Sequence, residues 1–237
     1  DKPNATENDL VFDNYAVERF RLNDDPIMYP SIDWRRYLLN KTSVQTQHNL
    51  NISGGTKDIR YFISLGFLYQ NGLLKQFEGV GYDNNYKYKR YNYRANLDFD
   101  ATKTTTLKIG IGGIVGNRNE PMINDATNSI WTLINQTTPF SSPGVIDGKL
   151  IVTPEERFDN KINLGNSALP KCYGTGYSTA INNTMNLDLL LNQKLDFITK
   201  GLSAEIKGAY NTSYGFTKKR KGQVEQFMPF YQSSLED

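Results

Sequence analysis

The sequence predicts an all-β fold: a segment of an antiparallel transmembrane β-barrel, with about six strands and long extracellular loops. Three observations lead to this prediction. Apolar and polar residues alternate over long runs, which is the period of a strand with one apolar face. In the run 61–69, aromatic side chains lie near both ends of the apolar face and aliphatic ones between them, as in strands that cross lipid. Short turns alternate with long links along the chain.

The first predicted hairpin lies within residues 45–74, where two alternating runs flank a polar turn at Gly55–Asp58. In the second run the odd positions are apolar or aromatic: Tyr61, Ile63, Leu65, Phe67 and Tyr69. A soluble sandwich strand can show the same alternation, so this run alone does not separate the two fold classes. The repetition of the pattern along the chain favours the barrel.

The second predicted hairpin turns at Asp100–Thr104 and carries a polar stripe on its first strand. Odd positions from Tyr91 to Phe99 are apolar, and the stripe between them is Arg90, Asn92, Arg94, Asn96 and Asp98. We expect the stripe to face the barrel lumen. There it either contacts the plug or substrate or forms a solvated ladder whose cross-strand pairs hold the register.

The third predicted hairpin turns at Phe197–Gly201. Odd positions in 181–191 and even positions in 202–216 are mostly apolar, so these two sets are expected to share one face. Glu205 and Lys207 fall on the opposite face of the second strand and are therefore predicted to point into the lumen. A polybasic run, Lys218 to Lys221, is expected in the loop that follows, as a solvated rim or a contact for an acidic glycan or lipopolysaccharide.

The unequal connections predict the topology. Bacterial outer-membrane barrels have short periplasmic turns and longer extracellular loops. On this basis we assign residues 1–46 to an extracellular loop with a short helix and 47–116 to four strands in two hairpins. Residues 117–177 form a long extracellular loop, 178–216 two further strands, and 217–237 the start of another loop. Because a membrane barrel needs at least about eight strands, we expect this chain to be a piece of a larger barrel.

Composition excludes several kinds of chemistry. The net charge is +2, with 27 basic and 25 acidic residues, so we expect no nucleic-acid partner. His48 is the only histidine and Cys172 the only cysteine, which leaves no pattern for a metal site, a catalytic triad or an intrachain disulfide. No residue set has a base, a nucleophile and an orienting group at usable spacing. The chain is predicted to be no enzyme and to hold no cofactor.

A resemblance to a known family rests on five motifs in fixed order. They are Tyr29–Pro30 with Asp33–Trp34, the strand Gln47–Gly55, the strand Arg60–Gly72, the strand Tyr88–Asp98, and the strand Lys103–Gly110. Their order, spacing and register resemble the SusC/RagA family of TonB-dependent outer-membrane transporters. The resemblance covers about residues 29–116. Phe67 and Asn71 depart from the residues that the family commonly has there, without disturbing the strand pattern.

The resemblance implies the rest of an importer. It implies a barrel of 22 strands, a plug and a TonB box, of which the plug, the TonB box and the remaining strands are absent from these residues. It also implies a cell outer membrane location with lipid around the wall, a SusD-like surface lipoprotein as lid, and active uptake of glycans, oligosaccharides or peptides. The alternative is a soluble β-sheet protein that binds or degrades polysaccharide. A passive porin or adhesin barrel is a third possibility, which the family motifs disfavour.

Four aromatic residues in the loops are candidates for ligand or lid binding: Trp34, Trp131, Phe140 and Tyr173. Trp34 is expected to open a short helix capped by Asp33 or Ser31, and Trp131 to lie on another short helix in the long loop. An exposed indole can stack on a sugar or pack against a partner, and it can equally anchor its own loop. By resemblance, the loop 117–177 is expected to form part of the lid interface or the upper binding cavity.

Overall fold

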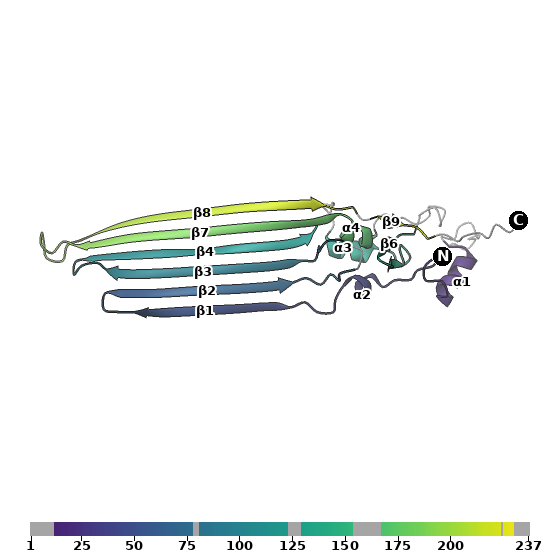
Figure 1. The fold of residues 1–237 in the computed structure, drawn as a ribbon, viewed down its shortest axis with the longest axis horizontal. Helices are drawn as coiled ribbons and strands as arrows, with labels where there is room; N and C mark the ends of the chain where they lie inside the picture. The colour runs from purple at the N-terminus through teal and green to yellow at the C-terminus, as the bar shows by residue number, and fades with distance from the viewer. Residues whose placement is uncertain (1–11, 78–80, 123–128, 154–166, 224, 230–237) are drawn as a thin grey trace, which may run out of the picture.

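The computed structural model describes residues 12–77, 81–122, 129–153, 167–223 and 225–229, and its main body is a long antiparallel sheet (Figure 1). The sheet has six strands in the order β1-β2-β3-β4-β7-β8. Their bounds are β1 Gln45–Gly55, β2 Ile59–Asn71, β3 Lys87–Asp100, β4 Thr105–Pro121, β7 Gly176–Lys194 and β8 Ser203–Lys221. Every strand pairs with its neighbour in antiparallel register.

Three tight turns join the strands at one end of the sheet, where the sequence predicts them. Between β1 and β2, the amide of Thr56 donates to the carbonyl of Ile59 at 2.6 Å. Between β3 and β4, the Thr102 hydroxyl accepts from the amides of Thr104 and Thr105. Between β7 and β8, Gly201 adopts φ +84°, a left-handed conformation that glycine reaches without strain, and its amide donates to Asp196.

The strands lengthen across the sheet, from 11 residues in β1 to 19 in β7 and β8. Four boundaries differ from the predicted ones. β1 begins at Gln45, β4 continues to Pro121, β7 begins at Gly176, and β8 continues to Lys221. The ladder explains the difference, because Lys218 and Arg220 pair with Thr179 and Tyr177 although their sequence is hydrophilic. The polybasic run is thus in a strand and not in a loop.

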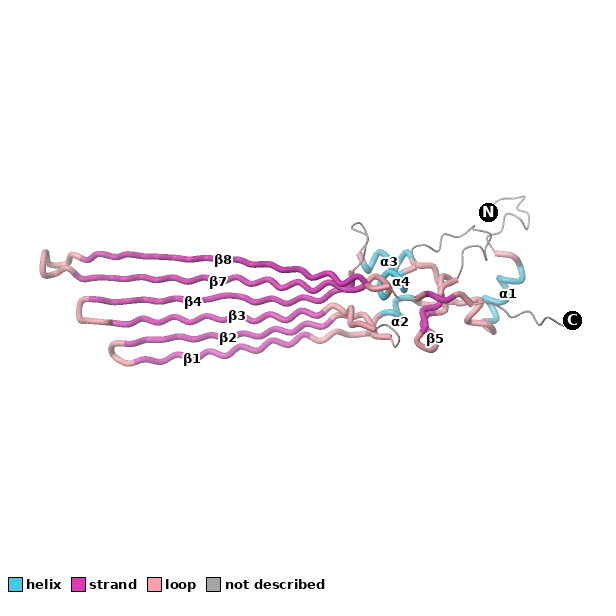
Figure 2. The backbone as a smooth tube through the Cα atoms, turned by 45° about the horizontal axis from the view of Figure 1, so that its top comes forward, coloured by secondary structure: helices cyan, strands magenta, loops and turns pink. Residues whose placement is uncertain are grey.

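The segments at the other end of the sheet fold together into a small body that we call the cap (Figure 2). It contains the helices α1 Asn14–Leu22, α2 Trp34–Leu38, α3 Ile130–Gln136 and α4 Ala168–Tyr173. A small sheet joins β5 Gly144–Ile146, β6 Lys149–Ile151 and β9 Gln226–Phe227. Asp13, Asp33 and Ser129 cap the first three helices by accepting from backbone amides.

The cap holds nearly all of the buried apolar side chains. Its core is made of Trp34, Leu38, Leu133, Ile134, Leu150, Ala168, Leu169, Cys172 and Tyr173. Among the described residues, Ala180 is the only buried apolar residue of the six-stranded sheet. No described helix has the length and hydrophobicity needed to cross a membrane.

Candidate functional site

The pairing register places apolar residues of all six strands on one face of the sheet, which we call the apolar face. The row across its middle reads, from β1 to β8, Ile52, Ile63, Ala95, Ile111, Leu187 and Tyr210. Odd residues of 61–69 and 91–99 and even residues of 204–216 share this face, so the predicted parity agrees with the register. Leu65 is 48% exposed and Ile206 71% exposed. An exposed apolar surface this extensive marks an interface with protein or lipid.

The opposite face, which we call the polar face, carries every residue predicted to face a lumen. One row joins Arg60, Asp98, Lys108, Leu190 and Lys207, and the adjacent row towards the turns ends at Glu205. The stripe on β3 lies on the same face: Arg90, Asn92, Arg94, Asn96 and Asp98. The register thus places the predicted residues of β3 and β8 on one face of the sheet, although they are far apart in sequence.

Ion pairs near the turns organise the polar face. Arg60 lies between two carboxylates, with Nε 3.9 Å from Asp98 Oδ2 and Nη1 3.3 Å from Asp100 Oδ2. The hydroxyl of Thr106 donates to Asp100 at 2.8 Å. These side chains are partly exposed, so each pair contributes little to stability. The contacts hold the Arg60 side chain beside the two carboxylates.

Two shallow hollows lie on the polar face. The one nearer the turns has a volume of about 500 Å³ and is lined by Arg60, Arg94, Asp98, Lys108, Asp188 and Lys207, among others. The one at mid-sheet has about 380 Å³ and is bordered by Asn92, Asn96, Thr184 and Asn186. Cations, carboxylates and amides alternate here, so the face can hydrogen-bond to polar solutes of either charge.

The structure buries two of the four aromatic candidates in the cap core. Trp34 is 3% exposed and its Nε1 donates to the Thr138 carbonyl at 2.8 Å. Tyr173 is fully buried and its hydroxyl donates to the Lys75 carbonyl at 2.6 Å. Burial raises the pKa of Tyr173, and it raises the pKa of the adjacent Cys172 thiol to about 12. Both rings act here as anchors of the cap, with their polar atoms satisfied inside it.

The other two aromatic candidates lie nearer the surface. Phe140 packs edge-on against Phe12 with ring centroids 4.9 Å apart, and Phe20 lies 5.8 Å away. Trp131 is 48% exposed on α3. It borders a pocket of about 420 Å³ at the junction of cap and sheet. Of the four, Trp131 is the residue best placed to touch a molecule from solution.

Sequence reasoning missed this junction pocket. It lies among Leu39, Gln70, Asn71, Leu74, Asn85, Glu120 and Trp131. The side chain of Asn85 is nearly buried, and its Nδ2 donates to the Leu74 carbonyl at 2.8 Å, while its Oδ1 has no partner among the described residues. The segment YDNNY, residues 82–86, was the available signal in the sequence. It places two adjacent Asn residues between aromatic residues, and amides that are buried there need hydrogen-bond partners.

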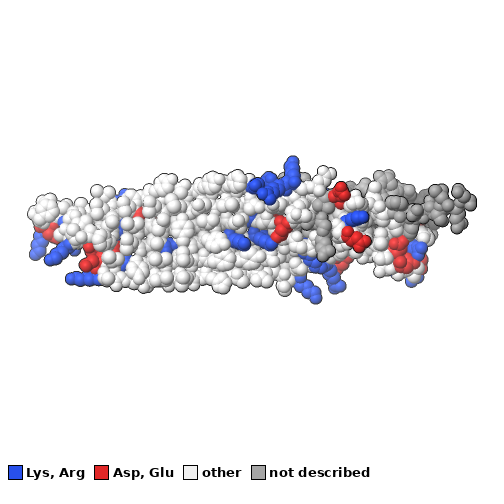
Figure 3. All heavy atoms as spheres, viewed as in Figure 1, with Lys and Arg blue, Asp and Glu red and all other residues white. Residues whose placement is uncertain are grey.

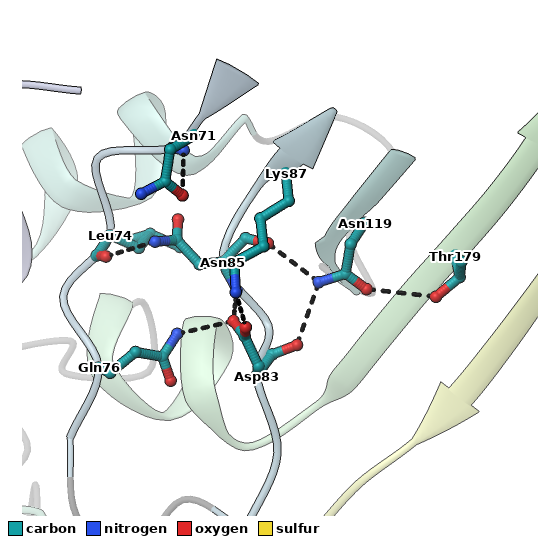
Figure 4. A network of polar contacts seen from close by, with 9 residues as sticks. Asn71, Leu74, Gln76, Asp83, Asn85, Lys87, Asn119 and Thr179 are labelled. Atoms are coloured by element: carbon teal, nitrogen blue, oxygen red, sulfur yellow. Dashed lines mark hydrogen bonds and ion pairs between the residues drawn. The ribbon is translucent and has the colours of Figure 1, made fainter. Parts of the chain in front are cut away.

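A network of polar contacts joins the cap segments to the strand ends (Figure 4). Asn119 of β4 donates to the carbonyls of Asp83 and Asn85 at 3.1 and 2.9 Å, and accepts from the hydroxyl of Thr179 at 3.2 Å. Lys87 pairs with the Asp83 carboxylate, which also accepts from Gln76. The loop before β3 is therefore fixed to β4 and β7 by side chains.

His48 lies in β1 opposite Phe67, on the apolar face, with ring centroids 6.4 Å apart. Within the described ranges, no three His, Cys, Asp or Glu side chains gather closely enough to hold a metal ion.

Comparisons with known proteins show which sequences and structures this chain is similar to. No family model matches the chain. The TonB-dependent receptor SusC of Bacteroides thetaiotaomicron is 28% identical over 125 residues, which cover 47% of this chain and 12% of that protein. The structure of the RagAB peptide importer in its closed-closed state matches 84% of this chain and 21% of its own chain, with a TM-score of 0.55 and 13% identity. A structure of the RagAB peptide transporter superposes less well, with a TM-score of 0.45 over 86% of this chain, 22% of that one and 15% identity.

These matches confirm the resemblance to the SusC/RagA family and the predicted fold, an antiparallel segment of barrel wall. The chain spans only about an eighth of SusC. The matched proteins are named as a receptor and an importer, in agreement with the prediction that this chain is not an enzyme.

Proposed function

We propose that this chain forms part of the barrel wall of an outer-membrane, TonB-dependent active importer. The observation that carries the proposal is the apolar face, which runs in register across all six strands and stays exposed in the chain. In water such a face costs about 25 cal/mol for each Å² of apolar surface. Lipid removes that cost, and the alternative of a soluble polysaccharide-binding sheet does not.

The polar face then lines the lumen. Its hollows near Arg94 and Asn96 offer cations, carboxylates and amides to a passing solute or to a plug. The substrate class is that of glycans, oligosaccharides or peptides, and the name of the RagAB peptide importer supports the last of these. TonB acts through parts of the importer outside this chain.

The cap lies on the extracellular side in this orientation, since it joins the ends of the strands opposite the tight turns (Figure 1). A SusD-like lipoprotein is proposed to dock there. Trp131 on α3, beside the junction pocket, is the proposed contact for the lid or for incoming substrate. Trp34, Phe140 and Tyr173 support that surface from within the cap.

The test uses the full-length importer in its native membrane. The wild-type protein is expected to fractionate with outer membranes and to need detergent for extraction. Trp131→Ala is expected to weaken co-purification of the lid lipoprotein or substrate-dependent growth, with normal membrane yield. Gln136→Ala, exposed on the same helix, is the matched control.

Recovery of the wild-type protein in the soluble fraction would overturn the proposed function. If Trp131→Ala and Gln136→Ala show the same lid binding and growth, Trp131 is not a contact for lid or substrate. The proposal that the sheet is part of the barrel wall would be unaffected. A point substitution is sharper than deletion of the loop, because α3 also supplies Leu133 and Ile134 to the cap core.

A further inference from the structure

The apolar face carries cations at one end only. At the ends of the strands nearest the cap, Lys87 and Lys89 of β3 and Lys218 and Arg220 of β8 share the parity of the apolar residues. Lys89, Lys218 and Arg220 are exposed. In the view of Figure 3, charged side chains gather towards the ends of the strands, with fewer along the middle.

The same face has no charged residue in the strands near the tight turns. The row there reads Phe99, Leu107, Leu191 and Ile206, and the next row towards the cap reads Gly54, Tyr61, Leu97, Ile109, Leu189 and Gly208. The charge is therefore asymmetric along the strands.

The register gives the spacing of the cations. Lys87, Asn119, Thr179 and Lys218 form one row, so the cations of β3 and β8 are three strand spacings apart, or roughly 14 Å. Side chains of Asn117, Asn119 and Thr179 lie between them. The side chains of Asn119 and Thr179 are occupied by each other and by the loop before β3, whose Asp83 carboxylate pairs with Lys87.

Arg220 is held in position by Tyr177 of the neighbouring strand. Its Nη1 donates to the Tyr177 hydroxyl at 2.6 Å, and its guanidinium lies 5.6 Å from the centre of the same ring. Lys87 is paired with Asp83, and no ion pair of Lys89, Lys218 or Arg220 occurs in the part of the chain that the structure describes. Three cations therefore remain for an external anion.

Aromatic residues lie beside and below the cations on the same face. Tyr69 and Phe216 share the row of Lys89, and Phe67, Tyr91 and Tyr214 occupy the next row towards the tight turns. Aromatic girdles mark the level at which hydrocarbon gives way to headgroups. An anion bound to these cations therefore lies at the headgroup level. A ligand that also covers the apolar face below needs an apolar part, so an anionic amphiphile fits both surfaces.

We propose that this basic patch, formed by Lys89, Lys218 and Arg220, binds the phosphate-bearing headgroup of a lipid of the outer leaflet. This inference rests on the proposed membrane location. Arg and Lys suit a phosphate, because a phosphate accepts several charge-assisted hydrogen bonds at once.

The chain supplies its own matched control on β8. Lys219 and Lys221 alternate with Lys218 and Arg220, are equally exposed, and point to the polar face. Lys218→Gln with Arg220→Gln and Lys219→Gln with Lys221→Gln therefore remove the same charge from the same strand end on opposite faces. The full-length importer is reconstituted into nanodiscs of phosphatidylcholine that contain a small fraction of diphosphorylated lipid A, and bound lipid A is titrated.

The Lys218→Gln/Arg220→Gln variant is expected to bind lipid A about 25-fold more weakly than wild type, at roughly fivefold for each cation. The control pair is expected to stay within about twofold. Dephosphorylated lipid A should bind both variants and the wild type alike. Millimolar inorganic phosphate should not displace the lipid, because the free anion lacks the apolar part.

Equal weakening by the two double variants would overturn the assignment to this face. Displacement by inorganic phosphate alone would reduce the patch to a free-anion site and overturn the headgroup. Failure of the wild-type protein to enter nanodiscs is a separate readout, and it would sink the proposed function together with this inference.

Discussion

The sheet and the cap treat apolar side chains in opposite ways. In the cap, Leu38, Leu133 and Tyr173 have no exposed surface. In the sheet, Leu189 is 47% and Ile206 71% exposed, although both are as apolar as any cap residue. The cap is therefore stabilised by its own core, as a soluble domain is. The apolar face of the sheet is not covered by this chain, so its burial requires an apolar surface or medium outside the chain.

The largest effect is expected from opening the cap core. Leu133→Ala removes a fully buried side chain and should cost about 2–5 kcal/mol of cap stability. Cys172, buried with a pKa raised to about 12, reports cap folding through its alkylation rate at pH 8. The thiolate is scarce and shielded while the cap is folded, so the variant should react faster than wild type.

The control for the cap is Gln136→Ala, an exposed change on the same helix that should leave the alkylation rate of Cys172 unchanged. Above pH 9 the free energy of cap unfolding should also fall, because a thiol whose pKa is higher in the folded state loses its stabilising contribution as pH rises towards about 12. Equal rates for Leu133→Ala and wild type would contradict an independent cap core.

The second effect concerns the sheet and its lipid. Leu187 lies in the middle row of the apolar face, and Asn186 beside it lies on the polar face. Arginine at a lipid-facing midplane position costs about 2–4 kcal/mol. Leu187→Arg should lower the folded fraction of the full-length protein in outer membranes far more than Asn186→Arg. Similar folded fractions, measured by heat-modifiable gel mobility, would show that the two faces meet the same medium.

The smallest effect is expected at the polar network between the two regions. Asn119→Ala removes three hydrogen bonds that join the loop before β3 to β4 and β4 to β7, at about 0.5 kcal/mol each because the groups are exposed or only partly buried. Thr179→Val removes only one of them. Amide hydrogen exchange in residues 81–86 should speed up in the first variant, and less in the second. No change in either would mean that the cap is held to the sheet by its core alone.

The faces of the strands were predictable because a period of two is a local property of the sequence. A slip of one residue would move charges such as Arg94 or Asp98 onto the apolar face, so the register is strongly specified. The polar stripe of β3 follows from the same rule. The resemblance to the SusC/RagA family rests on the same segment, and the comparison with SusC confirms it.

The cap was not predictable in the same way. Its contacts join distant segments: Trp34 donates to Thr138, 104 residues away, and the Val145 amide donates to the Tyr37 hydroxyl, 108 residues away. The cap helices that form its core have only 5 to 7 residues, too few for a helical period to show. Sequence alone therefore marks Trp34 and Tyr173 as candidates for ligand or lid contact. In the fold, both rings are buried in the cap core.

The strand ends were misjudged for a different reason. Residues such as Lys218 and Arg220 look like a loop in sequence, because hydrophilic side chains are common in loops. Backbone pairing with Thr179 and Tyr177 continues regardless of side chain, so the ladder extends past the apolar band.

The great length of β7 and β8 sets the height of the cap. Nineteen residues at about 3.3 Å each make a ribbon of roughly 60 Å, which rises about 44 Å at a tilt of 45°. The hydrocarbon layer is only about 30 Å thick. In the proposed membrane orientation, the hydrogen-bonded strands therefore continue through the headgroup layer, which brings the bilayer to about 40–45 Å, and they hold the cap just outside it. Movement of the cap relative to the sheet is then expected only beyond the last ladder pair, Gly176 with Lys221.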